Sequence, residues 1–250
     1  MKAVILAAGE STRLRPLTND RPKCMVEFQG KEIIDHILDT MRNCGLEDIA
    51  IVKGYCAHML NKEGTKTYTN KRFDETNMVS TFFCSEEYWD DDIIISYADI
   101  VYTPEVLDAL MKETAEISVV VDEDWRNQWE KRMDNPLDDA ETLKLNGNGC
   151  ILELGKKPKS YDEIQGQYIG LIKMRKSILP KIKELYESLD RKAQYDGKDF
   201  DNMFMTSFIQ LIIDQLNPVK AVFIQGGWVE IDTLDDLRNM ETHMAEERLF

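Results

Sequence analysis

The sequence predicts an α/β fold built around a mainly parallel β-sheet. Short apolar runs, typical of buried strands, alternate with stretches whose apolar residues recur at helical spacing. Such alternation indicates right-handed βαβ units, whose strands lie parallel in one sheet. Of the 250 residues, 43% are hydrophobic, which is enough to bury a sizeable core.

The first half of the chain follows this alternation regularly. Its strands are expected at Ala3–Leu6, Ile49–Val52, Ile93–Tyr97 and Ile117–Val121, and its helices at Ile33–Asn43, Met78–Tyr88 and Pro104–Thr114. The helix at Ile33–Asn43 has its apolar residues on one face and is closed by Gly45. The helix from Pro104 has proline in its first turn, where the missing N–H has no cost.

The second half is less regular. Asp134–Gly149 is polar and rich in turn residues. Strands are expected at Ile151–Leu154, Gly166–Met174 and Ala221–Ile224, with helical stretches after Ser177 and Asp201 and a last helix from about Leu234 to Arg248. There is no internal repeat and no linker, so residues 1–250 are expected to form a single domain.

Composition excludes several classes of function. The formal net charge of −15 argues against nucleic-acid binding, which depends on basic patches. No apolar stretch reaches the length of a membrane span, and the run Ala3–Ala8 is too short for a signal peptide. The five cysteines are odd in number and form no C-x-x-C pair, as expected for reduced thiols in a cytoplasmic protein.

The loop after the first expected strand has the residue types of a phosphate site. Leu6-Ala7-Ala8-Gly9 ends the strand with small residues, so backbone N–H groups can approach a ligand closely. Ser11, Thr12 and Arg13 add hydroxyls and a guanidinium suited to phosphate oxygens, and Pro22-Lys23 adds a second cation. The P-loop pattern and the G-x-G-x-x-G pattern are both absent.

This stretch resembles the opening motif of the nucleotidyltransferases that make nucleotide sugars and related activated compounds, L-A-A-G-x-G-[ST]-R-[LM]-x-P-L-T followed by P-K. The chain departs from it at Ser11, where the family has glycine. The resemblance implies a Rossmann-like three-layer α/β/α sandwich with a mostly parallel, mixed sheet of about seven strands. It also implies that the loop, together with Asn77 and Ser80, recognises the base.

Within the family, the short chain and the segments around Asn77 and Glu230 look most like cytidylyltransferases. The segment from Asp138 to Leu171 resembles the branch that activates phosphonates and phosphoramidates, with Lys157 and Tyr168 at the acceptor. This resemblance implies transfer of CMP from CTP to phosphoglutamine, aminoethylphosphonate or phosphocholine, with release of pyrophosphate. Residues 1–121 would then bind nucleotide and 122–250 the acceptor, in a role such as modification of capsule or cell-surface polysaccharide.

Two carboxylates follow expected strands. Asp99 comes after Ile93–Tyr97, and Asp232 comes after an apolar run that contains Glu230, a weaker third candidate. Carboxylates at the carboxyl ends of parallel strands lie at the usual ligand edge. The alternatives are a turn carboxylate for Asp99 and helix capping for Asp232. The resemblance favours Mg²⁺ at Asp99 and Asp232, a donor set that this cation accepts.

Trp125 and Trp129 stand four residues apart, beside acidic residues 122–124. On a helix they share one face and can hold an ammonium group by cation–π attraction. Packing in the core or in a homodimer is the alternative. Lys156 stands where the family has a sugar-binding glutamate, which favours an amine-bearing acceptor over a sugar.

The mechanism implied by the resemblance places Lys23 at the α-phosphate and Arg13 at the β,γ-phosphates of the nucleotide. The acceptor oxygen is already an anion, so positioning and charge neutralisation carry the reaction. Two alternatives stay open: a sugar-1-phosphate uridylyl- or thymidylyltransferase, and a non-catalytic regulatory relative that binds nucleotide.

Overall fold

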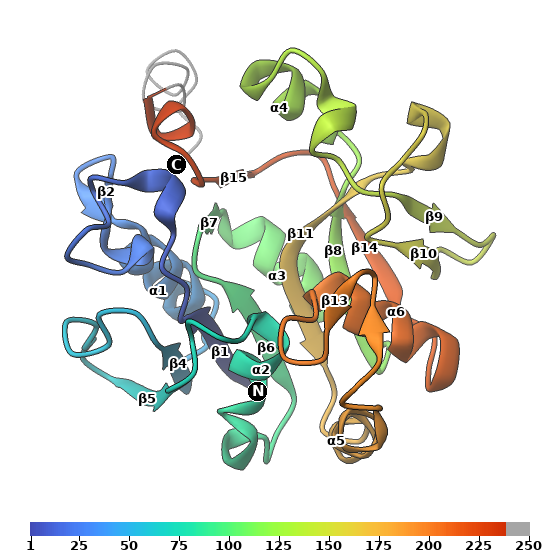
Figure 1. Ribbon diagram of the computed structural model, residues 1–250, viewed down its shortest axis with the longest axis horizontal. Helices are drawn as coiled ribbons and strands as arrows, with labels where there is room; N and C mark the ends of the chain where they lie inside the picture. The colour runs from blue at the N-terminus through green and yellow to red at the C-terminus, as the bar shows by residue number, and fades with distance from the viewer. Residues whose placement is uncertain (239–250) are drawn as a thin grey trace.

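A seven-stranded sheet forms the centre of the computed structural model, which describes residues 1–238 (Figure 1). The strand order is β14-β8-β11-β6-β1-β4-β5. These strands are β1 (Lys2–Ala7), β4 (Ile49–Lys53), β5 (Thr65–Thr69), β6 (Ile93–Tyr97), β8 (Ile117–Asp122), β11 (Gln167–Met174) and β14 (Lys220–Ile224). Strand β11 is antiparallel to both of its neighbours, whereas the other pairings are parallel, so the sheet is mixed and mostly parallel.

Helices cover both faces of the sheet. One face carries α1 (Ile33–Asn43) and α3 (Pro104–Lys112), and the other carries α2 (Met78–Phe83), α5 (Leu179–Ser188) and α6 (Met205–Gln215). Strand β1 shows why its sequence is apolar throughout: Ala3 and Ile5 pack into the first layer, and Val4 and Leu6 into the second. The predicted three-layer sandwich is therefore confirmed.

Smaller elements lie around the sheet. They are the helix α4 (Trp125–Arg132), the strand pairs β2 (Glu27–Phe28) with β3 (Lys31–Glu32), β7 (Ile100–Tyr102) with β15 (Trp228–Glu230), β9 (Leu143–Leu145) with β10 (Ile151–Leu154), and β12 (Gln194–Tyr195) with β13 (Lys198–Asp199), and 3-10 turns at Thr12–Leu14, Lys23–Met25, Glu86–Tyr88, Pro136–Asp138 and Tyr161–Glu163. Figure 1 shows β15 crossing the top of the view from the side of β14 toward the side of β2. Because β15 pairs with β7, the late part of the chain returns to the carboxyl end of β6.

Several expected elements differ from the structure. The helix expected at Met78–Tyr88 ends at Phe83, where the Ser85 hydroxyl donates a hydrogen bond of 2.8 Å to the Phe82 carbonyl and competes with the helical pattern. Strand β5 was missed because its sequence, TKTYT, is largely exposed at the sheet edge. Strand β10 exists as expected, but it pairs with β9 outside the central sheet.

The expected C-terminal helix is only partly covered by the structure. Residues 234–238 are helical, and the rest of the stretch to Arg248 lies outside the described residues. All five cysteines are free thiols. No helix within residues 1–238 is long and apolar enough to cross a bilayer. The cytoplasmic location and the homodimer stay predictions.

Candidate active site

Lys23 lies between the two carboxylates that the sequence singled out. Its Nζ is 2.9 Å from Asp99 Oδ2 and 2.8 Å from Asp232 Oδ1. Lys23 is only 7% exposed. Burial alone lowers the pKa of Lys23, but the charges of Asp99 and Asp232 outweigh it, so the pKa lies above its ordinary value. The ammonium group is therefore held charged at a fixed point in the site.

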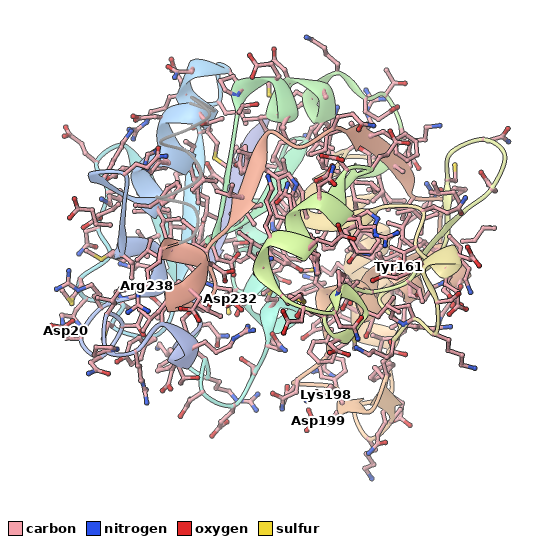
Figure 2. The ribbon with its side chains drawn as sticks, turned by 90° about the horizontal axis from the view of Figure 1, so that it is seen from above. Asp20, Tyr161, Lys198, Asp199, Asp232 and Arg238 are labelled. Atoms are coloured by element: carbon pink, nitrogen blue, oxygen red, sulfur yellow. The ribbon has the colours of Figure 1, made fainter. Side chains whose placement is uncertain are left out.

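Three segments far apart in the chain build this cluster. Asp99 stands in the turn between β6 and β7, and Lys23 begins a 3-10 turn directly after Pro22. The pairing of β15 with β7 continues as a hydrogen bond of 2.9 Å from Ile231 N to the Asp99 carbonyl, which brings Asp232 alongside. Figure 2 shows Asp232 near the middle of the molecule, with Asp20 and Tyr161 on opposite sides of it.

Asp232 is not the cap of the following helix. Thr233 and Asp236 form the capping pair: Asp236 Oδ2 accepts a 2.8 Å bond from Thr233 N, and Thr233 Oγ1 accepts a 3.0 Å bond from Asp236 N. The Asp232 carboxylate is thus left for cations, and it pairs with Lys23 and with the exposed guanidinium of Arg13. The capping alternative raised by the sequence is not supported.

The carboxylates fit a hard divalent cation. Asp99 Oδ1 is buried and has no hydrogen-bond partner among residues 1–238. A buried carboxylate oxygen without a partner is costly, and a bound cation would satisfy it. Together with Asp232, it offers the one or two carboxylates that Mg²⁺ usually takes, leaving its other positions for phosphate oxygens and water.

The loop after β1 lines an open cleft of about 630 Å³. The predicted residues that line it are Leu6, Ala7, Ala8, Gly9, Ser11, Lys23, Asn77 and Asp99. The cleft also includes Phe73, Thr76, Thr81 and Tyr97, which the sequence did not indicate. Among the residues that the structure describes, Thr12, Arg13, Ser80 and Asp232 do not line this cleft.

Two backbone positions fix the shape of this loop. Gly54, just after β4, lies so close that a Cβ there would be 2.5 Å from the Ala8 carbonyl oxygen, so only glycine fits. Ser11 has φ 51° and ψ 57°, the left-handed conformation that favours glycine. The departure from the motif at Ser11 therefore keeps the conformation that the motif's glycine would adopt.

The side chains of Asn77 and Ser80 make structural contacts. Asn77 Oδ1 accepts a 2.8 Å hydrogen bond from Met78 N at the start of α2, and its Nδ2 donates to the Asn202 carbonyl. The Ser80 hydroxyl donates to the Asp201 carbonyl at 3.4 Å. These bonds tie α2 to the segment after β13. Recognition of the base by Asn77 and Ser80 stays a prediction.

A second pocket of about 830 Å³ adjoins the cleft and shares Asn77, Met78 and Tyr97 with it. Its polar and aromatic lining includes Trp129, Asp139, Glu141, Tyr168, Trp228 and Glu230. The two cavities meet beside the cluster of Lys23, Asp99 and Asp232, which we call the Lys23 cluster. Asp99 lines the first cavity and Glu230 lines the second, and the pairing of β7 with β15 brings their segments together. This layout suits two substrates that react across one charged centre.

The predicted acceptor residues are not all at the second pocket. Tyr168 and Trp129 line it. Trp125 is 5% exposed and packs against Trp129 and Tyr161, so it belongs to the core. The Lys157 ammonium donates to the Leu137 carbonyl at 2.6 Å, and among the described residues it lines neither cavity.

Asp122, one of the acidic residues beside the tryptophans, has a structural role. Its carboxylate accepts hydrogen bonds from Trp228 Nε1 at 2.8 Å and from the backbone of Gly226 at 3.0 Å. Asp122 is fully buried, so it anchors β15 to β8 and is unavailable to an amine.

Residues 3–198 match the model of the MobA-like NTP transferase domain. The chain belongs to this family. It is therefore a nucleotidyltransferase, and its central sheet and loop are those of a nucleotide-transferring enzyme.

Two cytidylyltransferases align with this chain over nearly the full length of both proteins. The CTP:phosphoglutamine cytidylyltransferase of Campylobacter jejuni is 47% identical over 248 residues, which cover 95% of this chain and 98% of that protein. The choline-phosphate cytidylyltransferase of Streptococcus pneumoniae is 24% identical over 99% of this chain and 100% of that protein. The solved inositol-1-phosphate CTP transferase of T. maritima superposes with a TM-score of 0.74, covering 97% of this chain and 96% of that one. At 23% identity, this last similarity shows the fold alone.

The nucleotidyltransferase holds Glu230 in place with a buried guanidinium that the sequence did not indicate. Arg132, 7% exposed in its side chain, lies 2.8 Å from Glu230 Oε2 and 2.8 Å from Asp236 Oδ1. Burial raises the pKa of Glu230 to about 7, although Arg132 opposes the shift. Arg132 thus ties α4 to β15 and to the turn that carries Asp232.

Replacing Arg132 by methionine is expected to lower the free energy of unfolding by about 3–5 kcal/mol, because it leaves the buried carboxylate of Asp236 without its cation. Urea denaturation followed by circular dichroism measures the change. The matched control is Arg126→Met on the same helix, which removes an exposed ion pair with Glu130 and should cost less than about 1 kcal/mol. Equal losses in the two variants would contradict a structural role for Arg132.

Proposed function

We propose that this nucleotidyltransferase transfers CMP from CTP to a small amine-bearing phosphate or phosphonate, with phosphoglutamine as the foremost acceptor, and releases pyrophosphate. The observation that carries the proposal is the Lys23 cluster at the junction of two adjoining cavities. The 47% identity with the phosphoglutamine enzyme of Campylobacter jejuni supports the choice of nucleotide and acceptor.

The reaction joins an acceptor oxygen to the α-phosphorus of CTP. That oxygen is already anionic, so no strong base is needed. The new P–O bond forms as the bond between the α-phosphorus and the bridging oxygen breaks, and pyrophosphate leaves with the bonding electrons. The protein must align the two anions and neutralise their charge.

Lys23 is assigned to the α-phosphate. It is buried, charged and close to the small-residue loop of Ala7, Ala8 and Gly9, which lines the same cleft. Arg13 is assigned to the β,γ-phosphates, because its exposed guanidinium pairs with Asp232, which also pairs with Lys23. Backbone N–H groups of the loop would approach the phosphates and the base.

Asp99 and Asp232 are assigned to Mg²⁺. The unpartnered Asp99 Oδ1 and the two adjacent carboxylates support this assignment. When bound, the cation would supply charge stabilisation to the phosphate oxygens. Lys23 pairs with both carboxylates, so its ammonium is positioned at the same point where the two substrates meet.

The second cavity is assigned to the acceptor, and most of its lining comes from residues 122–250, the half predicted to bind the acceptor. Its lining contains three carboxylates and, among the residues that the structure describes, no lysine or arginine. Such a pocket favours a cationic group. A hexose-1-phosphate carries no cation, so this charge pattern supports an amine-bearing acceptor over a sugar phosphate.

A pyrophosphate-release assay tests the proposal. CTP, UTP, dTTP and ATP are each combined with phosphoglutamine, aminoethylphosphonate, phosphocholine and glucose-1-phosphate. We expect the highest kcat/KM with CTP and an amine-bearing acceptor. Faster turnover of glucose-1-phosphate with UTP or dTTP would favour the sugar-1-phosphate alternative. Nucleotide binding without pyrophosphate release would favour a regulatory relative.

A further inference from the structure

The acceptor pocket contains one carboxylate that has no partner among residues 1–238. Asp139 Oδ2 accepts a 3.0 Å hydrogen bond from Trp129 Nε1, and Glu230 is paired with Arg132 at 2.8 Å. The Glu141 carboxylate, by contrast, has no hydrogen bond or ion pair among residues 1–238, although the backbone of Glu141 is fixed by Gln167. The pocket therefore presents an anion with no cation of its own.

The surroundings of Glu141 make this unpaired charge costly. Burial, and to a lesser extent the nearby carboxylates of Asp139, Asp196 and Glu230, together raise the pKa of Glu141 to about 7. A carboxylate in such an environment gains more from a cation than one exposed to water does, because the local dielectric is low.

A second polar group in the same pocket also lacks a partner. The Tyr168 hydroxyl is buried, and no hydrogen-bond partner for it exists within residues 1–238. Tyr168 lines the pocket and packs edge-on against Tyr97 with ring centroids 5.9 Å apart. Burial is the main reason that the pKa of Tyr168 lies well above its ordinary value; the neighbouring Tyr97 hydroxyl adds to the shift, and Glu141 contributes less. Glu141 and the Tyr168 hydroxyl thus lie near each other in this pocket.

The tryptophan faces are less available for a cation. Trp129 is 5% exposed, and its ring already packs against Trp125, Trp228 and the Arg132 guanidinium, which lies 5.4 Å from the ring centroid. Cation–π attraction needs an open aromatic face. A carboxylate is therefore the more accessible group for a positive charge in this pocket, and binding of an ammonium group by Trp125 and Trp129 stays a prediction.

We propose that Glu141 is the specificity residue that binds the ammonium group of the acceptor, with the Tyr168 hydroxyl accepting a second N–H. This inference rests on the proposed function and names the residues that recognise the ammonium group of the acceptor. A primary ammonium can donate N–H bonds to both groups, whereas a quaternary ammonium cannot. Tyr97 lines both cavities, so a small acceptor held at Glu141 can direct its phosphate end toward the Lys23 cluster.

The test compares acceptors that differ only in the amine. Aminoethylphosphonate is paired with ethylphosphonate, and phosphoglutamine with its analogue lacking the α-amino group. For Glu141→Gln we expect the KM of the amine-bearing acceptor to rise by about 30-fold, the scale of one lost charged hydrogen bond. The kcat and the KM for CTP should stay within about threefold, because the rest of the contacts remain. The KM of the analogue without the amine should not change.

The matched control is Glu130→Gln, which alters an exposed carboxylate on α4 that is paired with Arg126. It should leave every parameter unchanged. Tyr168→Phe should raise the KM of the amine-bearing acceptor several-fold and leave the analogue unaffected. If Glu141→Gln does not fold, the same selective effect in Tyr168→Phe decides the question.

The outcomes separate the two proposals. If wild-type protein releases no pyrophosphate from CTP with any amine-bearing acceptor, the proposed function fails. If wild-type protein is active but Glu141→Gln and Tyr168→Phe affect both members of a pair equally, or neither, the assignment of the ammonium to Glu141 is overturned.

Discussion

Replacing Asp99 or Asp232 by alanine is expected to lower kcat by about 1,000-fold or more. Each substitution removes one of the two carboxylates proposed to hold Mg²⁺, whose charge stabilisation contributes several kcal/mol to such reactions. It also removes one of the two anions that fix the Lys23 ammonium. Steady-state pyrophosphate release measures the loss, and circular dichroism establishes that each variant is folded.

A neighbouring carboxylate provides the control. Asp235→Asn changes an exposed residue in the helix that follows Asp232 and should leave kcat unchanged. Binding of Mn²⁺ measured by electron paramagnetic resonance, without nucleotide turnover, should weaken in the Asp99 and Asp232 variants only. Wild-type activity that persists in excess EDTA would contradict the proposed metal site.

Replacing Lys23 by alanine is expected to lower kcat by about 100-fold or more. A buried, fixed charge near the α-phosphate stabilises the transition state more than the ground state, and losing one such contact typically has this effect. Single-turnover measurements with saturating CTP isolate the chemical step. Lys23→Arg should recover little activity, because a larger planar group must fit the same buried site between two carboxylates.

The control for Lys23 is Lys31→Ala, which removes a lysine paired with Asp39 on the surface and should leave kcat unaltered. An effect of Lys23→Ala that is confined to KM would show that this lysine binds the substrate and the transition state equally. That result would leave the nucleotide-binding role intact and remove the catalytic one.

Most elements of the fold could be predicted from local sequence patterns. The strand at Ala3–Leu6 was predictable because it is a continuous apolar run buried on both faces, and the helix at Ile33–Asn43 because its apolar residues recur at helical spacing. Strand β5 was not, because the sequence of this exposed edge strand carries no apolar pattern. The antiparallel direction of β11 was equally hidden, since an apolar run does not specify the direction in which a strand pairs.

The candidate site, like the fold, was only partly predictable from the sequence. The small-residue loop could be selected from the sequence because it matches a contiguous motif, and Asp99 and Asp232 because they come shortly after strands at positions that the family resemblance implies. That Lys23 lies between the two carboxylates depends on the pairing of β15 with β7. No local pattern records this pairing, since the segments are more than a hundred residues apart.

The role proposed for Glu141 in the second pocket depends on tertiary structure, although Trp129 and Tyr168 of the same pocket could be selected from the sequence. Glu141 lies in a polar, turn-rich segment where carboxylates are ordinary, and nothing near it in the sequence marks it as buried. Its neighbours Tyr168 and Glu230 come from β11 and β15, and Arg132, which neutralises Glu230, comes from α4. Whether a charge is paired depends on which distant groups pack around it. The sequence by itself therefore determined most of the fold and the small-residue loop of this enzyme, and only the folded chain decided which carboxylate of the second pocket is left without a partner among residues 1–238.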